Sequence, residues 1–283
     1  MPPTPSLRRE ALAALCTAEP ADKAARTHAL WQRWRALGAD DTVAWDAASA
    51  LVPDPAQPLP GRPERPVLVA PHAVAQRSPF TREGLAALVH AIAHIEFNAI
   101  NLALDAVWRF AAMPTDFYRQ WLQVAHEEAT HFGLLSEQLQ ALGHAYGDFP
   151  AHNGLWEMCV KTRHDVTARM ALVPRTLEAR GLDATPLIQA RLRQVNTPEA
   201  RRVVEILDRI LRDEIGHVAV GNRWYAWLCG RQGLAPVAHY RQLARQHAAP
   251  RLRGPFNLEA RRSAGFSEAE LAELAGAAAG QPE

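Results

Sequence analysis

Cysteine is scarce and widely spaced in this chain. Only three cysteines occur, Cys16, Cys159 and Cys229, and no two of them form a Cys-x-x-Cys pair. Scattered single cysteines are typical of proteins that remain in a reducing compartment. The spacing therefore favours a cytoplasmic protein and argues against a fused rubredoxin-like iron centre.

An excess of charge of one sign is also lacking. Lys and Arg together number 31 and Asp and Glu number 30, and the basic residues form no stripe with interleaved aromatic residues. The composition therefore does not support nucleic-acid binding. Long apolar runs are missing too, since no stretch approaches the roughly 20 residues of a membrane span and the beginning has no signal-peptide core. We expect no membrane partner, and we leave a homodimer open as the assembly state.

What is present is enough apolar sequence, 48% of 283 residues, to fill one sizeable core with additional segments around it. Residues 1–80 predict two or three short helices before residue 52, among them Leu7–Cys16 and Ala21–Leu37, followed by a proline-rich segment. That segment, Pro53–Pro79, should be an extended strap, because proline fixes φ and removes amide donors. We expect its apolar residues Val67, Leu68 and Val69 to lie against the main body.

Residues 81–232 predict an all-α four-helix bundle, and residues 233–283 predict a C-terminal helical extension. Helix signals, which are N-cap residues, prolines and turn clusters, set the bounds. The second long helix has Thr115 as its expected N-cap, the third should kink at Pro174, and the fourth has Thr197 as its N-cap. The expected helices are Thr81–Ala112, Thr115–Gly143, Leu155–Arg180, Thr197–Cys229 and Ala235–Gln246, with a loop at 251–257 and a short helix from Ser267.

Two Glu-x-x-His pairs, Glu128–His131 and Glu214–His217, lie deep inside the second and fourth of these helices. Roughly one such match is expected by chance in a chain of this composition, so their position carries more weight than their number. Residues 3, 4, 7 and 11 positions away share a helix face with each Glu. Those neighbours are Leu85, Val89, Ile92, Ile100, Ala103 and Val107 around Glu96, Phe117, Trp121, Val124, Phe132, Leu135 and Leu139 around Glu128, and Val203, Leu207, Ile210, Leu211, Val218 and Tyr225 around Glu214. Each Glu should therefore face the core.

Buried carboxylates must be paired or bound to metal, because burying an isolated one costs several kcal/mol or more. Glu96 and Glu178, from the first and third helices, complete the ligand set of a dinuclear site: one Glu from each of two helices and Glu-x-x-His from each of two others. Carboxylate and imidazole ligands suit iron or manganese better than structural zinc. We therefore predict two Fe ions, with Mn or a mixed Mn/Fe pair as alternatives.

Further residues surround this set. Glu178 is its weakest member, because its helix face is less apolar, and His164 and Glu157 fall near the same face as alternative or additional ligands. The acids that precede the two motifs, Glu127 and Asp213, could orient the histidines, since a ligating His usually donates its other N–H to a carboxylate. The hypothesis pairs Asp213 with His131 and Glu127 with His217.

Simpler interpretations remain for every member of this set. The Glu-x-x-His pairs could be exposed helix pairs, and Glu96 and Glu178 could be buried acids paired with arginine in a metal-free helical scaffold. His94 and His126 lie off the ligand face and suit a surface or supporting position.

Seven segments carry a resemblance to a known family: AEPADKAARTHALWQRW, HAIAHIEFNAINLALD, VAHEEATHF, GDFPAHNGLWE, VPRTLEARGLD, DEIGHVAVGNRWY and GPFN. They span most of the chain, which resembles the bacterial family known as domain of unknown function 455, within the ferritin-like superfamily. The resemblance implies a ferritin-like bundle with a di-metal centre. Its ligands would be Glu96, Glu128, His131, Glu178, Glu214 and His217.

The function expected from these patterns is that of a diiron oxidoreductase or hydroxylase. It would use O₂ or peroxide and a small-molecule substrate that the sequence does not identify, with electrons from an external electron donor. The alternative is a non-catalytic metal-binding or iron-handling protein with ferroxidase-like behaviour. The wider superfamily includes a diiron hydroxylase that acts on modified tRNA. A similar function for this chain would rest on analogy of fold alone.

Overall fold

The computed structural model describes residues 6–37 and 45–279. Within these residues the secondary structure is helical, and the only β-type pairing is an isolated bridge between Leu68 and Ala151. The all-α prediction is thus confirmed for the described part. The chain forms two compact units, Met1–Trp156 and Glu157–Glu283. The division into 1–80, 81–232 and 233–283 stays a prediction.

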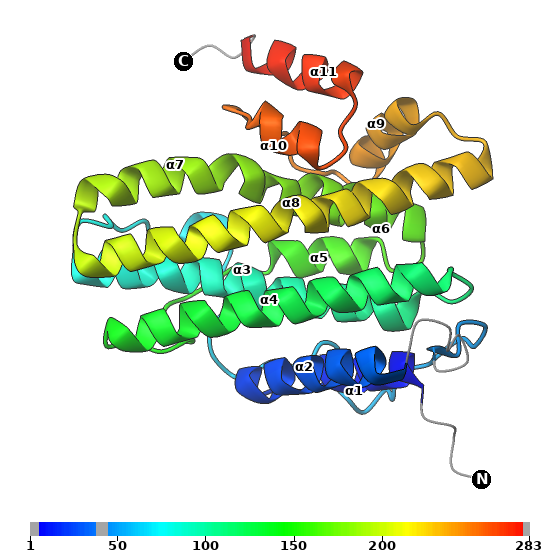
Figure 1. Cartoon of the computed structure of the whole chain (residues 1–283), viewed down its shortest axis with the longest axis horizontal. Coiled ribbons are helices and arrows are strands. Elements are labelled where there is room, and N and C mark those ends of the chain that lie inside the picture. Colours follow the sequence, from blue (N-terminus) through cyan, green and yellow to red (C-terminus); the bar gives the residue numbers. More distant parts are fainter. Residues whose placement is uncertain (1–5, 38–44, 280–283) are drawn as a thin grey trace. The chain divides into compact units, whose positions relative to one another are not determined.

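The first unit is built on two long helices, α3 (Arg82–Arg109) and α4 (Thr115–Ala141). The short segment 110–114 joins them, so they run antiparallel and side by side (Figure 1). Helix α1 (Leu7–Leu15) packs on α3, and α2 (Pro20–Leu37) packs on α4. These four helices lie close to the predicted ranges. Two of the two or three short helices expected before residue 52 are thus seen. Residues 38–44 lie outside the described part, and Trp45, which has 3₁₀ geometry, is followed by turns, so a third helix stays a prediction.

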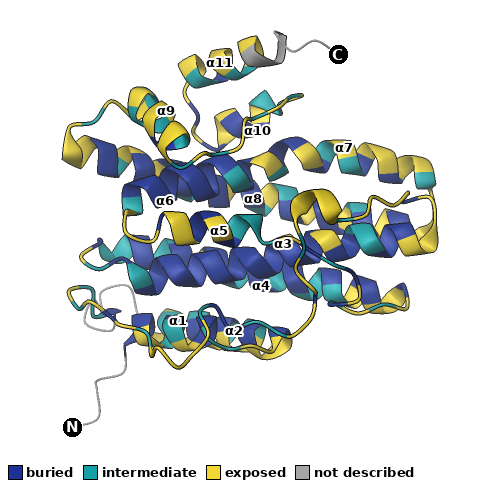
Figure 2. Cartoon of the chain, turned by 180° about the vertical axis from the view of Figure 1, so that it is seen from behind, coloured by how far each residue is buried: buried dark blue, intermediate teal, exposed yellow. Residues whose placement is uncertain are grey.

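Helix α3 is buried along most of its length (Figure 2). Thr81 caps it as its side chain accepts a hydrogen bond from the Gly84 amide at 3.1 Å. Contrary to the sequence expectation, α3 is long and apolar enough to span a membrane, but 78% of its most apolar window is buried within the protein. Such burial is typical of a core helix. Helix α4 begins at Thr115 with Pro114 in the N-cap position, so the N-cap predicted at Thr115 is wrong by one residue.

The proline-rich strap forms no α-helix and is largely extended, as predicted, with a hydrogen-bonded turn at 54–57 and the short 3₁₀ turn η2 (Pro71–Ala73). Its apolar residues do not all pack inward, since Val67 is 60% exposed and Leu68 is 40% exposed. Backbone contacts hold it instead: the Val69 amide donates to Ala151 O at 2.8 Å, and the Ala151 amide donates to Val67 O at 3.1 Å. Residue 61 must be glycine, because a Cβ there would lie 2.1 Å from a backbone oxygen of the α1 end.

A buried lysine ties the strap to the helices. Lys23 of α2 donates to Leu15 O and Gly61 O, each at 2.9 Å, and to the Asn101 side chain of α3. Burial lowers the pKa of Lys23 to about 7. Three acceptors satisfy the three donors of the ammonium group, so this contact fixes where α1, α2, α3 and the strap meet.

The second unit contains α6 (Val166–Leu172), the π-helical segment η3 (Val173–Glu178), α7 (Ala179–Val195) and the long α8 (Pro198–Gln232). A single kinked helix Leu155–Arg180 was predicted, and this is corrected in two ways. Helix α5 (Gly154–Lys161), which straddles the unit boundary, ends before a turn at 162–165. There Asp165 caps α6 by accepting from the Thr167 amide at 2.8 Å and the Ala168 amide at 3.0 Å.

Proline does not end the helix at the second interruption. At Pro174 the chain winds as a π-helix and continues as α7 well beyond Arg180. Thr197 caps α8 as predicted, accepting from the Ala200 amide at 3.2 Å. The remaining helices are α9 (Pro236–Gln246), α10 (Leu258–Ser263) and α11 (Glu268–Ala279) (Figure 1).

Candidate metal centre

The first unit brings together three of the predicted ligands in its interior. Glu96 lies on α3, and Glu128 and His131 lie one turn apart on α4. The Nδ1 atom of His131 is 3.2 Å from Glu96 Oε2 and 3.4 Å from Glu128 Oε2. Exposure is 1% for Glu128 and zero for His131. One ligand atom from each residue lies within 4.8 Å of the others, which makes a buried Glu/His cluster that could bind a metal ion.

The apolar faces predicted around these acids are buried. All six apolar neighbours named for Glu96, and all six named for Glu128, are core residues, and among the six of Glu214 only Leu211 is partly exposed. The polar contacts of Glu96 are to His131 and Glu128. The interpretation of Glu96 as an acid paired with arginine is therefore wrong, and so is the interpretation of the Glu-x-x-His pairs as exposed.

Burial sets the electrostatics of this cluster. Desolvation, followed by the nearby charge of Glu128, raises the pKa of Glu96 well above its ordinary value. Desolvation opposes protonation of His131, but the hydrogen bonds to Glu128 and Glu96 outweigh it and raise the pKa of His131 to about 11. Burial next to each other's charges thus favours the protonated forms of both Glu96 and His131.

The second unit holds the other three predicted ligands. Glu214 and His217 lie one turn apart on α8, and His217 Nδ1 is 3.1 Å from Glu214 Oε2. Glu178, the last residue of η3, is buried. Gly181 follows it by one turn on α7, and a Cβ at Gly181 would lie 3.9 Å from Glu214 Oε1. Gly181 therefore faces the Glu214 side chain, and Glu178 lies about one helical turn from Gly181.

The additional ligands proposed from the sequence are not supported. His164 and Glu157 are exposed, and Arg163 Nε lies 2.8 Å from His164 Nε2. Counting helical phase back from Glu178 fails here, because the helix is interrupted at 162–165 and rewound at η3.

The two acids next to the motifs are partly exposed and have partners on their own helices. Glu127 Oε1 accepts from Gln123 at 2.9 Å, and Asp213 forms ion pairs with Arg209 at 3.6 Å and Arg212 at 3.1 Å. The pairing of Asp213 with His131 and of Glu127 with His217 joins residues of different units and stays a prediction.

Sequence reasoning underestimated one buried polar network in the first unit. His94 of α3 is buried, with Nδ1 2.8 Å from the Tyr146 hydroxyl and Nε2 3.1 Å from His152 O. Together with the strap residues around Arg62 and with Asn98, it lines a small cavity of about 30 Å³. Helix phase had placed His94 off the ligand face, and no motif marks the loop tyrosine that binds it. His126 is half-buried, and its Nδ1 lies 2.8 Å from that of His28.

Comparisons with known proteins place these residues in a family context. A protein from Haemophilus influenzae (strain ATCC 51907 / DSM 11121 / KW20 / Rd), described as an uncharacterized protein, is 52% identical over 216 residues, which is 74% of each chain. No solved structure matches the chain. The family model described as "Protein of unknown function (DUF455)" matches residues 16–272, a range that includes all six predicted ligands. The chain therefore belongs to the DUF455 family.

Proposed function

We propose that this protein is a ferritin-like, dinuclear-metal oxidoreductase, with two Fe ions as the metal pair and Mn or Mn/Fe as alternatives. The observation that carries the proposal is the cluster of Glu96, Glu128 and His131, buried among apolar side chains of α3 and α4. The second unit holds three further buried residues of the same types, Glu178, Glu214 and His217, and the last two are in contact. Two such sets form the ligand pattern of a dinuclear site in a helical bundle.

The donor set suits a hard or borderline divalent cation. Its donor atoms are carboxylate oxygens and one imidazole nitrogen per unit, with no thiolate among the six residues, a combination that favours iron or manganese over structural zinc. Two buried carboxylates next to each other are costly unless a cation neutralises them, as the raised pKa of Glu96 indicates. Metal would displace the protons that hold the cluster without it.

Each residue has a role in this proposal. Glu128 and Glu214 would bridge the two ions, Glu96 and Glu178 would be terminal ligands, and His131 and His217 would each complete one ion. When bound, a close metal pair supplies the redox chemistry that reduces O₂ or peroxide while a substrate is oxidised. The apolar residues around the carboxylates exclude water from the site. An external electron donor is required, because the three cysteines form no fused electron-transfer motif.

Oxygen consumption tests the proposal against the iron-handling alternative. Fe(II)-loaded protein is supplied with O₂ and an excess of a small reductant, and O₂ uptake is followed. An oxidoreductase consumes O₂ over many cycles with about two irons bound per chain. An iron-handling protein consumes O₂ in proportion to added Fe(II) and then stops.

The matched variants are Glu128→Ala and Glu137→Ala, because Glu137 is an exposed acid on the same helix. Glu128→Ala should abolish the metal-dependent uptake, and Glu137→Ala should leave it unchanged. Uptake that persists in Glu128→Ala would exclude the cluster as its source.

A further inference from the structure

The π-helical segment η3 delivers Glu178 to the α7–α8 face of the second unit. It covers Val173–Glu178, between α6 and α7. A π-turn contains an extra residue relative to α-helical winding, and it is rare except as a bulge at functional sites. Each α-helical residue turns the helix by about 100°. Loss of the extra residue would therefore rotate Glu178 relative to α6 by about one such step.

Close packing and side-chain hydrogen bonds favour the π-winding. Gly221 of α8 lets Pro174 approach, since a Cβ at position 221 would be 2.6 Å from Pro174 Cβ and Cγ. The Thr176 hydroxyl donates to Ala171 O at 2.8 Å and lies 3.0 Å from the Tyr240 hydroxyl of α9. These contacts involve three neighbouring elements, so the winding depends on what surrounds η3.

The strongest of these contacts comes from the C-terminal helix. Arg175 of η3 is buried, and its guanidinium forms an ion pair with Glu270 of α11 and donates to Asn222 Oδ1 at 2.9 Å. Its Nε has no hydrogen-bond partner among the described residues. Three aromatic rings surround the guanidinium instead, at 5.2, 5.3 and 4.8 Å from its carbon; they belong to Tyr225, Tyr240 and Phe266.

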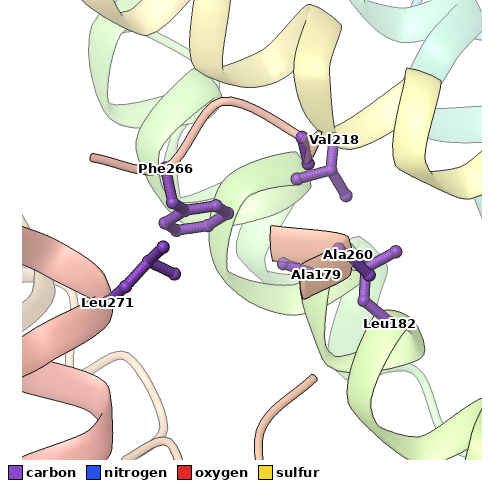
Figure 3. Close-up of a cluster of buried hydrophobic side chains, with 7 residues drawn as sticks. Ala179, Leu182, Val218, Ala260, Phe266 and Leu271 are labelled. Carbon is purple, nitrogen blue, oxygen red and sulfur yellow. The ribbon is translucent and has the colours of Figure 1, made fainter. Parts of the chain in front are cut away.

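Apolar contacts hold the same C-terminal segment in place. Phe266 and Leu271 belong to one buried cluster with Ala179, Leu182 and Val218 (Figure 3). Ala179 directly follows the predicted ligand Glu178, and Val218 directly follows the predicted ligand His217. The C-terminal segment therefore packs directly behind the backbone that presents both side chains.

We infer that Glu270 is a positioning residue for the metal centre: by binding Arg175 it holds η3 in the winding that places Glu178 one helical turn from Gly181, which faces Glu214. The inference rests on the proposed function, since it takes Glu178 as a metal ligand. Residues that orient ligands typically change metal affinity by about 10- to 100-fold when they are replaced. Because Glu178 is a terminal ligand, the effect should fall on one ion of the pair.

The test is a titration of the full-length metal-free protein with Mn²⁺ and, under anaerobic conditions, with Fe²⁺. Glu270→Gln keeps the size of the side chain and removes its charge. Glu273→Gln is the matched control, because Glu273 lies on the same helix and forms an exposed ion pair with Arg241. We expect Glu270→Gln to weaken one binding step by about tenfold or more, with the other step close to wild type. Glu270→Asp should restore part of the loss, and Glu273→Gln should match wild type.

Two results would overturn the inference while the proposed function stands. In one, Glu270→Gln binds both ions as tightly as wild type. In the other, both steps weaken equally and in proportion to a lowered Tm, as expected for general destabilisation. A wild-type protein that binds neither Mn²⁺ nor Fe²⁺ would overturn the proposed function and the inference together. Thermal unfolding of each metal-free variant distinguishes these cases.

Discussion

At the scale of single residues, Glu96 shows how burial beside a second acid affects a carboxyl group. Its carboxyl group is buried next to Glu128, and burial raises its pKa well above the ordinary value. A carboxyl whose pKa is raised on folding stabilises the fold only while it keeps its proton. That contribution is fully present below the ordinary pKa of the unfolded chain and is lost as the pH rises through the raised value.

Glu96→Gln should therefore stabilise the metal-free protein at neutral to alkaline pH, because glutamine keeps the shape of the protonated acid and does not ionise. We expect a gain of about 1–2 kcal/mol, or a few degrees in Tm, that grows as the pH rises from the ordinary pKa of the carboxyl group toward its raised pKa. The same variant should gain less Tm than wild type when metal is added. Thermal unfolding with and without Mn²⁺ measures both effects.

The control for this experiment is Glu83→Gln, which replaces an exposed acid on the same helix. Its Tm should follow wild type at every pH and metal concentration. If metal-free Glu96→Gln were less stable than wild type across this pH range, the electrostatic account of the cluster would be wrong.

At the scale of helices, sequence signals worked where a cap and an apolar stripe coincide. Thr81 and Thr197 cap α3 and α8 as expected, and the stripes around Glu96, Glu128 and Glu214 are buried. These faces follow from helical periodicity, which a single sequence contains. The burial of five of the six predicted ligands, all except Glu178, could therefore be predicted from the sequence by counting residues along each helix.

The region around Glu178 could not be predicted in the same way. Asp165 ends one helix and caps the next, and Pro174 is accommodated by π-winding. That winding depends on Gly221 and Arg175, whose partners are distant in sequence. Tertiary contacts of this kind are invisible to a local pattern, so the prediction of one kinked helix failed there. His164 and Glu157, which that helix would place near the face of Glu178, are exposed.

Gly221 allows a direct test of the π-winding. Gly221→Ala places a Cβ 2.6 Å from Pro174, and overpacking of this kind typically costs about 1–3 kcal/mol. Gly230→Ala is the matched substitution on the same helix, where a Cβ meets nothing within 4 Å. It should stabilise by up to about 1 kcal/mol, because alanine restricts the unfolded chain.

Urea unfolding of both glycine variants gives the comparison. Opposite signs are expected, with Gly221→Ala destabilised and Gly230→Ala neutral or stabilised. Equal changes in the free energy of unfolding for the two variants would show that the close packing of Gly221 against Pro174 does not contribute to stability.

At the scale of the whole molecule, each of the two compact units buries three predicted ligands. Burial of these acids and histidines is not required to form an apolar core. Glu96, Glu128 and His131 come from the first unit, and Glu178, Glu214 and His217 come from the second. The family match covers both sets. If each set held a separate ion, loss of one set would spare the other ion. A shared centre with bridging carboxylates would instead lose both ions together.

The measurement that tests this most directly is the metal content of protein purified from cells supplemented with iron and manganese. Wild type should contain about two Fe or Mn per chain. Glu128→Ala and Glu214→Ala should each fall well below one, whereas Glu137→Ala and Glu205→Ala, which replace exposed acids on the same two helices, should match wild type. Full metal content in Glu128→Ala, or no stoichiometric metal in wild type under any loading condition, would contradict the dinuclear metal centre.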